Sequence, residues 1–100
     1  MRKLIIAGNW KMHKDAKSTE EFCNALAQYL VNHNQIRVLP LIAPAFPFLE
    51  KALKILNGLP AEVAAQDVST HLEGAYTGEV SAHQLSSLGL HYCIVGHSER

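Results

Sequence analysis

Polar side chains able to do chemistry gather where two apolar runs of the chain end. Asn9 and Lys11 come directly after the first run, and His97 and Glu99 directly after the fourth. If the runs are parallel strands, their carboxyl ends meet at one edge of the sheet, which is where active sites of such folds lie. An amide, an ammonium and an imidazole at one rim can stabilise an oxygen that gains negative charge during a reaction.

Four short apolar runs are the candidate strands that must position these groups. None of them alternates strictly between apolar and polar residues, which favours a parallel sheet covered on both faces. Pro40 lacks the N–H that a ladder needs, so its strand requires an edge-like or irregular position there. The runs are Leu4–Ala7, Val38–Ala43, Val63–Gln66 and Tyr92–Gly96.

Helical patterns separate these runs. Ser18-x-x-Glu21 predicts a capping box that opens the first helix, and Pro47 suits the first turn of the second. Ser81-x-x-Gln84 predicts a cap for the third helix, with Gly89 ending it. The predicted apolar positions are Phe22, Leu26, Tyr29 and Leu30 in the first helix, Leu49, Ala52, Leu53 and Leu56 in the second, and Leu85 and Leu88 in the third.

Repeated βα units fit either an open doubly wound sheet or a (β/α)8 barrel, and periodicity does not choose between them. No G-x-G-x-x-G follows the first strand and no G-x-x-x-x-G-K-[ST] loop occurs, so nucleotide-binding folds lose their main support. The segment 67–80 is too long for an ordinary βα connection, which makes it a candidate functional loop.

Composition places the chain among globular proteins. Hydrophobic residues make up 48% and charged residues 18%, and nine basic residues balance nine acidic ones, so neither a nucleic-acid footprint nor a polybasic membrane surface is indicated. No secretory signal or membrane-spanning run is present. Cys23 and Cys93 lie in apolar stretches and are expected to be buried, reduced thiols. We therefore expect a cytoplasmic protein.

Three motifs together resemble the triosephosphate isomerase family. They are Gly-Asn-Trp-Lys-Met at 8–12, Gly-Ala-Tyr-Thr-Gly-Glu at 74–79 and Gly-His-Ser-Glu-Arg at 96–100, in the order and at the spacing of that family. The resemblance implies a (β/α)8 barrel of about 250 residues. Residues 1–100 would be the N-terminal part of a single barrel domain, with its first four strands and three helices, truncated after strand 4.

The resemblance also assigns catalytic roles. Lys11 corresponds to the family's essential lysine, whose ammonium offsets charge on the phosphorylated substrate and the enediolate, and Asn9 to the asparagine that helps hold the substrate oxygen. His97 corresponds to the electrophilic histidine at the carbonyl oxygen. Glu99 corresponds to a glutamate that contacts the lysine, although a carboxylate in a helix first turn is favourable without any catalytic role.

The implied partners are a small phosphorylated triose and, at full length, a second copy of the protein. Thr77 corresponds to the tip of a loop that enters the other subunit of a homodimer, and Met12 to part of the receiving surface. No cofactor, metal, nucleic acid or membrane is implied. His91-x-Cys93-x-x-x-His97 has a spacing too weak to argue for a metal site.

The general base is the missing part of this machinery. In the family it is a glutamate after strand six, and none of Glu73, Glu79 or Glu99 corresponds to it. We therefore expect the 100-residue chain alone to be inactive as an isomerase. Two alternatives stay open: another barrel enzyme acting on phosphorylated sugars, and a non-catalytic barrel fragment used in folding or assembly.

Overall fold

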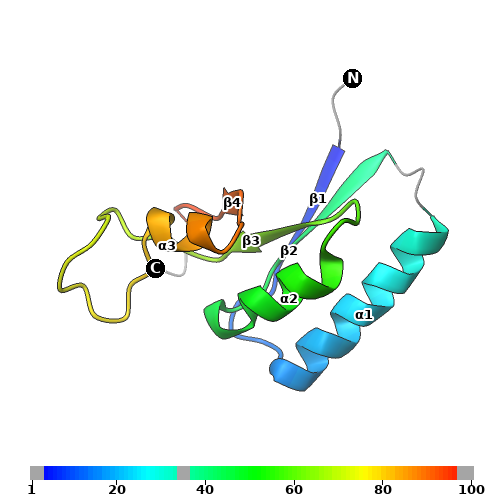
Figure 1. Ribbon diagram of the computed structural model, residues 1–100, viewed down its shortest axis with the longest axis horizontal. Coiled ribbons are helices and arrows are strands. Elements are labelled where there is room, and N and C mark those ends of the chain that lie inside the picture. Colours follow the sequence, from blue (N-terminus) through cyan, green and yellow to red (C-terminus); the bar gives the residue numbers. More distant parts are fainter. Residues whose placement is uncertain (1–3, 34–36, 97–100) are drawn as a thin grey trace.

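A computed structural model describes residues 4–33 and 37–96, in which strands and helices alternate along the chain (Figure 1). In chain order the elements are β1 (Leu4–Asn9), α1 (Ala16–Asn32), β2 (Val38–Ala43), a 3₁₀ turn η1 (Phe46–Phe48), α2 (Leu49–Leu56), β3 (Glu62–Ala65), α3 (Ala82–Ser87) and β4 (Tyr92–Cys93).

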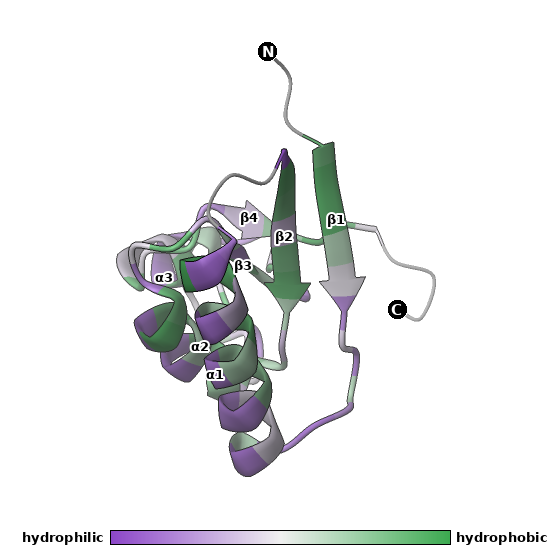
Figure 2. Ribbon diagram, turned by 90° about the vertical axis from the view of Figure 1, so that its right-hand side faces the viewer, coloured by the Kyte–Doolittle hydropathy of each residue, from purple (hydrophilic) through white to green (hydrophobic). Residues whose placement is uncertain are grey.

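The four strands form one parallel sheet in the order β1-β2-β3-β4. The β1–β2 register runs from Leu4 opposite Val38 to Asn9 opposite Ala43, so both strands end at the same edge. Figure 2 shows their arrowheads pointing the same way. This topology confirms the predicted βα repeats and suits the first half of a barrel better than a doubly wound sheet, whose strand order reverses at a switch point.

Pro40 lies where the sheet tolerates a missing donor. It is opposite Ile6 of β1, but the pairing of β2 with β3 begins only at Leu41, opposite Glu62. No β3 residue pairs with Pro40, so the strand is edge-like at this point, as the sequence predicts.

The helices cover one face of the sheet (Figure 2). Ile42, Val63 and Ala65 point into the main core, which they share with side chains of all three helices. The alternate strand positions Leu41, Ala43 and Ala64 are buried in a second, smaller cluster with Ile94, on the opposite face. The helical members of the main core are Cys23, Leu49, Ala52, Leu56 and Leu85.

Strand β1 is exposed, and here the prediction of a sheet covered on both faces is wrong. Leu4, Ile5 and Ile6 are 62%, 45% and 59% exposed. Helix α1 packs against α2 and not closely against β1, and β1 is the end strand of the sheet. The consecutive apolar side chains of β1 therefore form surfaces that no other part of these 100 residues covers in the described structure.

Helix α1 begins earlier than predicted. Its N-cap is Asp15, whose Oδ1 accepts a hydrogen bond from the Ser18 N–H at 2.9 Å, while the Ser18 hydroxyl accepts one from the Asp15 N–H at 2.9 Å. The reciprocal box is thus Asp15-x-x-Ser18, and the predicted pairing of Ser18 with Glu21 is wrong. The Asp15 carboxylate accepts the Ser18 N–H, which has no partner within the helix. A cap at Ser18 would act about one turn later.

The buried face of α1 also differs from its predicted stripe. The predicted Leu30 is buried and the predicted Leu26 half-buried, but Phe22 is 39% and Tyr29 53% exposed. Thr19 and Cys23 are buried in their place. In α2 the predicted Leu49, Ala52 and Leu56 are buried, with Leu53 half-buried. In α3 the Ser81–Gln84 capping box is confirmed, Leu85 is buried, and Leu88 is 41% exposed.

The two cysteines have different surroundings. Cys23 is buried in α1, where burial raises the pKa of its thiol, whereas Cys93 is exposed in β4, contrary to expectation. Strand β4 has just two residues and lies at the other end of the sheet, so little packs on Cys93. In the described ranges, no helix combines the length and the apolar character that crossing a membrane requires.

Candidate active site

The first candidate site lies where β1 ends. Asn9 is the last residue of the strand, and its side-chain Oδ1 accepts a hydrogen bond from the Lys11 N–H at 2.9 Å. This Asx-type contact bends the chain sharply after the strand. Lys11 has φ 54°, in the left-handed region of backbone conformation that residues other than glycine rarely adopt. Both residues are exposed at the carboxyl edge of the sheet.

Gln66 joins the ends of three strands at this edge. It follows β3, and its Nε2 donates to the carbonyl oxygen of Lys11 at 2.7 Å and to that of Ala43, the last residue of β2, at 2.8 Å. In the sequence, Gln66 ends the third apolar run, and no role was predicted for it. The signal was its position, since an amide there faces the same edge as Asn9.

The indole of Trp10 anchors the segment to α1. Its ring meets the Phe22 ring edge-on, with centroids 5.1 Å apart, and the Lys14 ammonium lies 5.1 Å from the Trp10 centroid. The backbone N–H of Trp10 donates to the Ala43 carbonyl oxygen at 3.2 Å. The segment that carries Lys11 is thus fixed from both sides, by the sheet through Ala43 and by the helix through Phe22.

His97 and Glu99, the other two predicted catalytic residues, lie outside the described residues. The chain leading to them follows the common strand direction, because the Ile94 N–H donates to the Ala65 carbonyl oxygen at 2.9 Å and β4 pairs in parallel with β3. The convergence of Asn9 and Lys11 is therefore described, and that of His97 with them stays a prediction.

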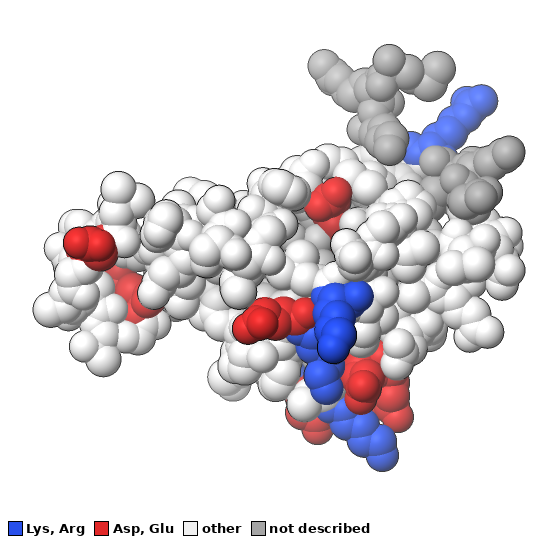
Figure 3. Space-filling view, in the orientation of Figure 1, with Lys and Arg blue, Asp and Glu red and all other residues white. Residues whose placement is uncertain are grey.

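The loop 67–80 extends away from the sheet (Figure 1). Its base is closed by a hydrogen bond of 2.7 Å from the Ser69 N–H to the Val80 carbonyl oxygen. The loop contains acidic residues and neither lysine nor arginine, and Figure 3 shows the acidic atoms at this end of the molecule. Thr77, its predicted contact residue, is exposed.

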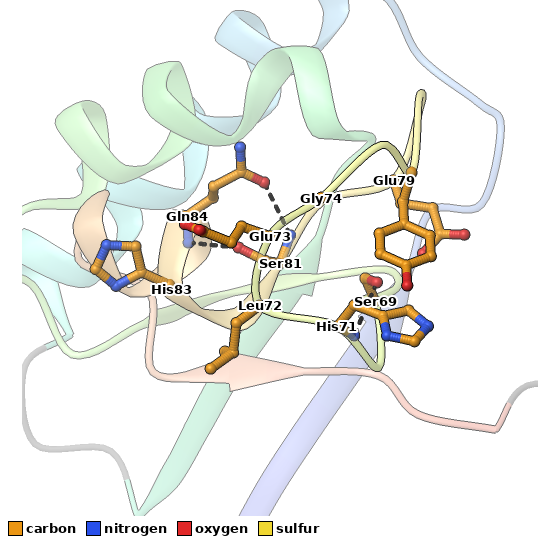
Figure 4. Close-up of a pocket in the computed structure, with 10 residues that line it drawn as sticks. Ser69, His71, Leu72, Glu73, Gly74, Glu79, Ser81, His83 and Gln84 are labelled. Carbon is orange, nitrogen blue, oxygen red and sulfur yellow. Dashed lines mark hydrogen bonds between the residues drawn. The ribbon is translucent and has the colours of Figure 1, made fainter.

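A pocket of about 270 Å³ lies between this loop and the start of α3 (Figure 4). His71 and Tyr76 stack there with ring centroids 3.9 Å apart. Gly74 has φ +137°, and a Cβ at this position would lie 2.9 Å from the Tyr76 ring, so glycine is required. The loop and the start of α3 line the pocket, which does not include Asn9 or Lys11.

Metal-ligating geometry is absent from the two described segments, in which no three His, Cys, Asp or Glu residues gather. The five histidines that they contain, at positions 13, 33, 71, 83 and 91, are all exposed.

Comparison with known proteins decides the family. The family model described as Triosephosphate isomerase matches residues 4–100. The chain belongs to the triosephosphate isomerase family. Membership agrees with the parallel sheet and its helices, which form the N-terminal part of a (β/α)8 barrel.

Curated relatives carry the same name. The whole chain aligns with proteins named triosephosphate isomerase from Thermus thermophilus at 47% identity, Trichodesmium erythraeum at 46% and Flavobacterium johnsoniae at 45%. The 100 aligned residues cover 39%, 41% and 39% of these three relatives, respectively. The chain thus spans about two fifths of the length of the triosephosphate isomerases that it matches.

Proposed function

We propose that the full-length protein containing this chain interconverts dihydroxyacetone phosphate and glyceraldehyde 3-phosphate by proton transfer through an enediolate. The observation that carries the proposal is the family match over residues 4–100. The position of Asn9 and Lys11 at the carboxyl edge supports it. Removing a proton next to a carbonyl builds negative charge on oxygen, and donors fixed beforehand around that oxygen lower the barrier.

In this proposal four residues act on or near the substrate oxygens. Lys11 supplies the positive charge that offsets the phosphate and the enediolate, and Asn9 holds the substrate oxygen while its side chain also orients the Lys11 peptide. His97 donates a hydrogen bond to the carbonyl oxygen, and Glu99 contacts the lysine. No cofactor or metal takes part.

The chain alone is proposed to be inactive, because the family's general base follows the sixth strand and no glutamate of these 100 residues corresponds to it. A reaction that abstracts a carbon-bound proton needs such a base within reach of the C–H bond. Purified residues 1–100 should show no interconversion above background. Turnover near that of the full-length protein would contradict the assignment of the base.

The decisive experiment compares two lysine variants of the full-length protein. Lys11→Met should lower kcat/KM by about 100-fold or more, the usual effect of removing one charge-stabilising donor. The matched control is Lys54→Met, which removes an exposed lysine of α2. Equal activity of both variants would reject the role of Lys11. A wild-type protein that turns over a different phosphorylated sugar instead of a triose would reject the substrate.

The proposal includes a homodimer in which Thr77 enters the partner subunit and Met12 forms part of the receiving surface. Met12 is 96% exposed, which is unusual for a methionine and supports its burial by a partner. Sedimentation of full-length Met12→Asp should show more monomer than wild type.

We also propose a cytoplasmic location, which suits the two free thiols Cys23 and Cys93 and is tested by cell fractionation.

A further inference from the structure

Lys11 has an unfavourable backbone conformation at the proposed active site. Its φ of 54° is in the left-handed region, which costs a residue with a Cβ about 1–2 kcal/mol. Such a residue keeps its conformation only where surrounding contacts impose it. The contacts that hold the peptide groups on either side of Lys11 therefore determine the position and direction of its side chain.

Two side chains hold Lys11 from opposite ends. Its N–H donates to Asn9 Oδ1 at 2.9 Å, and its carbonyl oxygen accepts from Gln66 Nε2 at 2.7 Å. The first contact is local, two residues apart. The second spans 55 residues and ties the segment to the end of β3. A backbone hydrogen bond of 3.1 Å from the His13 N–H to the Trp10 carbonyl oxygen also closes the turn that contains Lys11. The Gln66 contact acts on the Lys11 carbonyl oxygen itself.

The contact requires a side chain that donates hydrogen bonds. Gln66 Nε2 has two hydrogens, and two carbonyl oxygens, those of Lys11 and Ala43, lie at 2.7 and 2.8 Å from it. A carboxylate has no donor to offer either oxygen, and an apolar side chain leaves both without this donor. Gln66 is half-buried. Its bond to the Ala43 carbonyl oxygen is partly buried, so water replaces that bond incompletely, whereas its bond to the Lys11 carbonyl oxygen is exposed.

We propose that Gln66 is a positioning residue that keeps Lys11 in its left-handed conformation and thereby aims the Lys11 ammonium at the substrate. The inference rests on the proposed function for its effect on rate, and on the two hydrogen bonds of Lys11 and its φ for its effect on the Lys11 backbone. Gln66 acts through Lys11 and contacts no substrate itself.

The test uses full-length Gln66→Met, which keeps the length of the side chain and removes the donor. The matched control is Gln28→Met, at an exposed position of α1. We expect kcat of the Gln66 variant to fall about 10- to 100-fold, the effect of misplacing a catalytic group by about 1 Å. KM should change less than kcat, because the ammonium is needed most in the transition state. The control should match wild type.

A crystal structure of the Gln66→Met protein decides the question independently of rate. We expect Lys11 to leave φ near 54° or to occupy more than one conformation. A variant in which Lys11 keeps the wild-type φ in a single conformation overturns the inference, whatever its kcat. If Gln66→Met does not fold, Gln66→Glu carries the same measurement, with a larger expected fall in kcat because its carboxylate faces two carbonyl oxygens.

The two proposals fail in different ways. If the wild-type full-length protein has no isomerase activity, the proposed function is rejected, and the φ of Lys11 in the variant still judges the role of Gln66. If wild type is active and the Gln66 variant is equally active, the positioning role alone is rejected.

Discussion

Two lysines in the segment after β1 have positive φ, 54° for Lys11 and 73° for Lys14. Neither is glycine, asparagine or aspartate, the residues that adopt this region most readily. For Lys14, the position of its ammonium near the Trp10 and Phe22 rings, 5.1 and 5.4 Å from their centroids, accompanies the conformation. For Lys11, two side-chain hydrogen bonds accompany it. Strain of this kind is found where function needs a particular side chain at a particular point.

Replacing Lys11 should reveal that strain. Lys11→Gly and Lys11→Ala both remove the side chain, so their difference isolates the backbone. Glycine adopts φ 54° without a Cβ penalty, and its greater freedom in the unfolded chain offsets part of the gain. We expect the glycine variant to be more stable than the alanine variant by about 0.5–1 kcal/mol. Denaturant unfolding of the two full-length variants measures this, and a more stable alanine variant would contradict it.

Sequence reasoning could find Asn9 and Lys11 because both lie where the first strand ends, Asn9 as its last residue and Lys11 two residues later. That position fixes the edge of the sheet where they lie. It could not find the role of Gln66, because that role depends on two carbonyl oxygens brought near by the fold, one of them 55 residues away in the chain. A polar residue after a strand looks the same whether it holds backbone or faces water.

At the scale of elements, α1 shows how a local pattern can be misassigned. Asp15-x-x-Ser18 and Ser18-x-x-Glu21 both match a capping box, and intrinsic preference hardly separates aspartate from serine at an N-cap. The structure selects Asp15. That choice shifts the start of the helix by three residues. The predicted Leu30 is buried, but Thr19 and Cys23 are buried where the sequence predicted Phe22 and Tyr29.

The Asp15 cap makes a prediction about acid stability. The Ser18 N–H, and then the Ser18 hydroxyl, hydrogen-bond the carboxylate and lower the pKa of Asp15 below its ordinary value of 3.8. A lowered pKa in the folded protein means that the ionised carboxylate stabilises α1 fully at pH values above the pKa of Asp15 in the unfolded chain. This stabilisation is lost as the pH falls through the pKa of Asp15 in the folded protein.

Asp15→Asn keeps a good N-cap that cannot ionise. The stability of wild type relative to this variant should be constant above about pH 5 and should decline as pH falls through 3.8 and below. Urea unfolding of both full-length proteins from pH 6 to pH 3 measures the difference. A difference that does not change with pH, or that grows toward acid, would show that the carboxylate is not the cap.

Strand lengths were less predictable than strand order. The apolar run 92–96 predicted a long fourth strand, and only Tyr92 and Cys93 pair with β3. Strand pairing needs a neighbour as well as a suitable sequence, and β4 is the end strand of this sheet. The order of strands follows from the alternation of strands and helices, which sequence periodicity reports directly.

For the whole molecule, the sheet has one face covered by helices and ends in β1, whose apolar residues are exposed (Figure 2). A full barrel removes both ends of the sheet by closing it. The apolar sequence of β1 therefore suits a strand of the complete family fold. Its side chains are exposed here because the chain spans about two fifths of the length of such a relative. This is why the fold class was predictable and the burial of β1 was not.

Exposure of an end strand predicts self-association of the 100-residue chain. An unpaired strand edge with apolar side chains is a template for another chain, and a lysine there is a common natural safeguard. Leu4 in β1 is 62% exposed and Val31 in α1 is 64% exposed. Val31 is therefore a matched control, because it is as accessible as Leu4 but lies in a helix and not in the end strand. Leu4→Lys should therefore shift residues 1–100 toward monomer in sedimentation velocity at rising concentration, and Val31→Lys should not. If both lysines act equally, association is driven by general apolar exposure and not by the edge of β1. If the unmodified chain is a monomer that unfolds cooperatively, the open edge is tolerated without a partner.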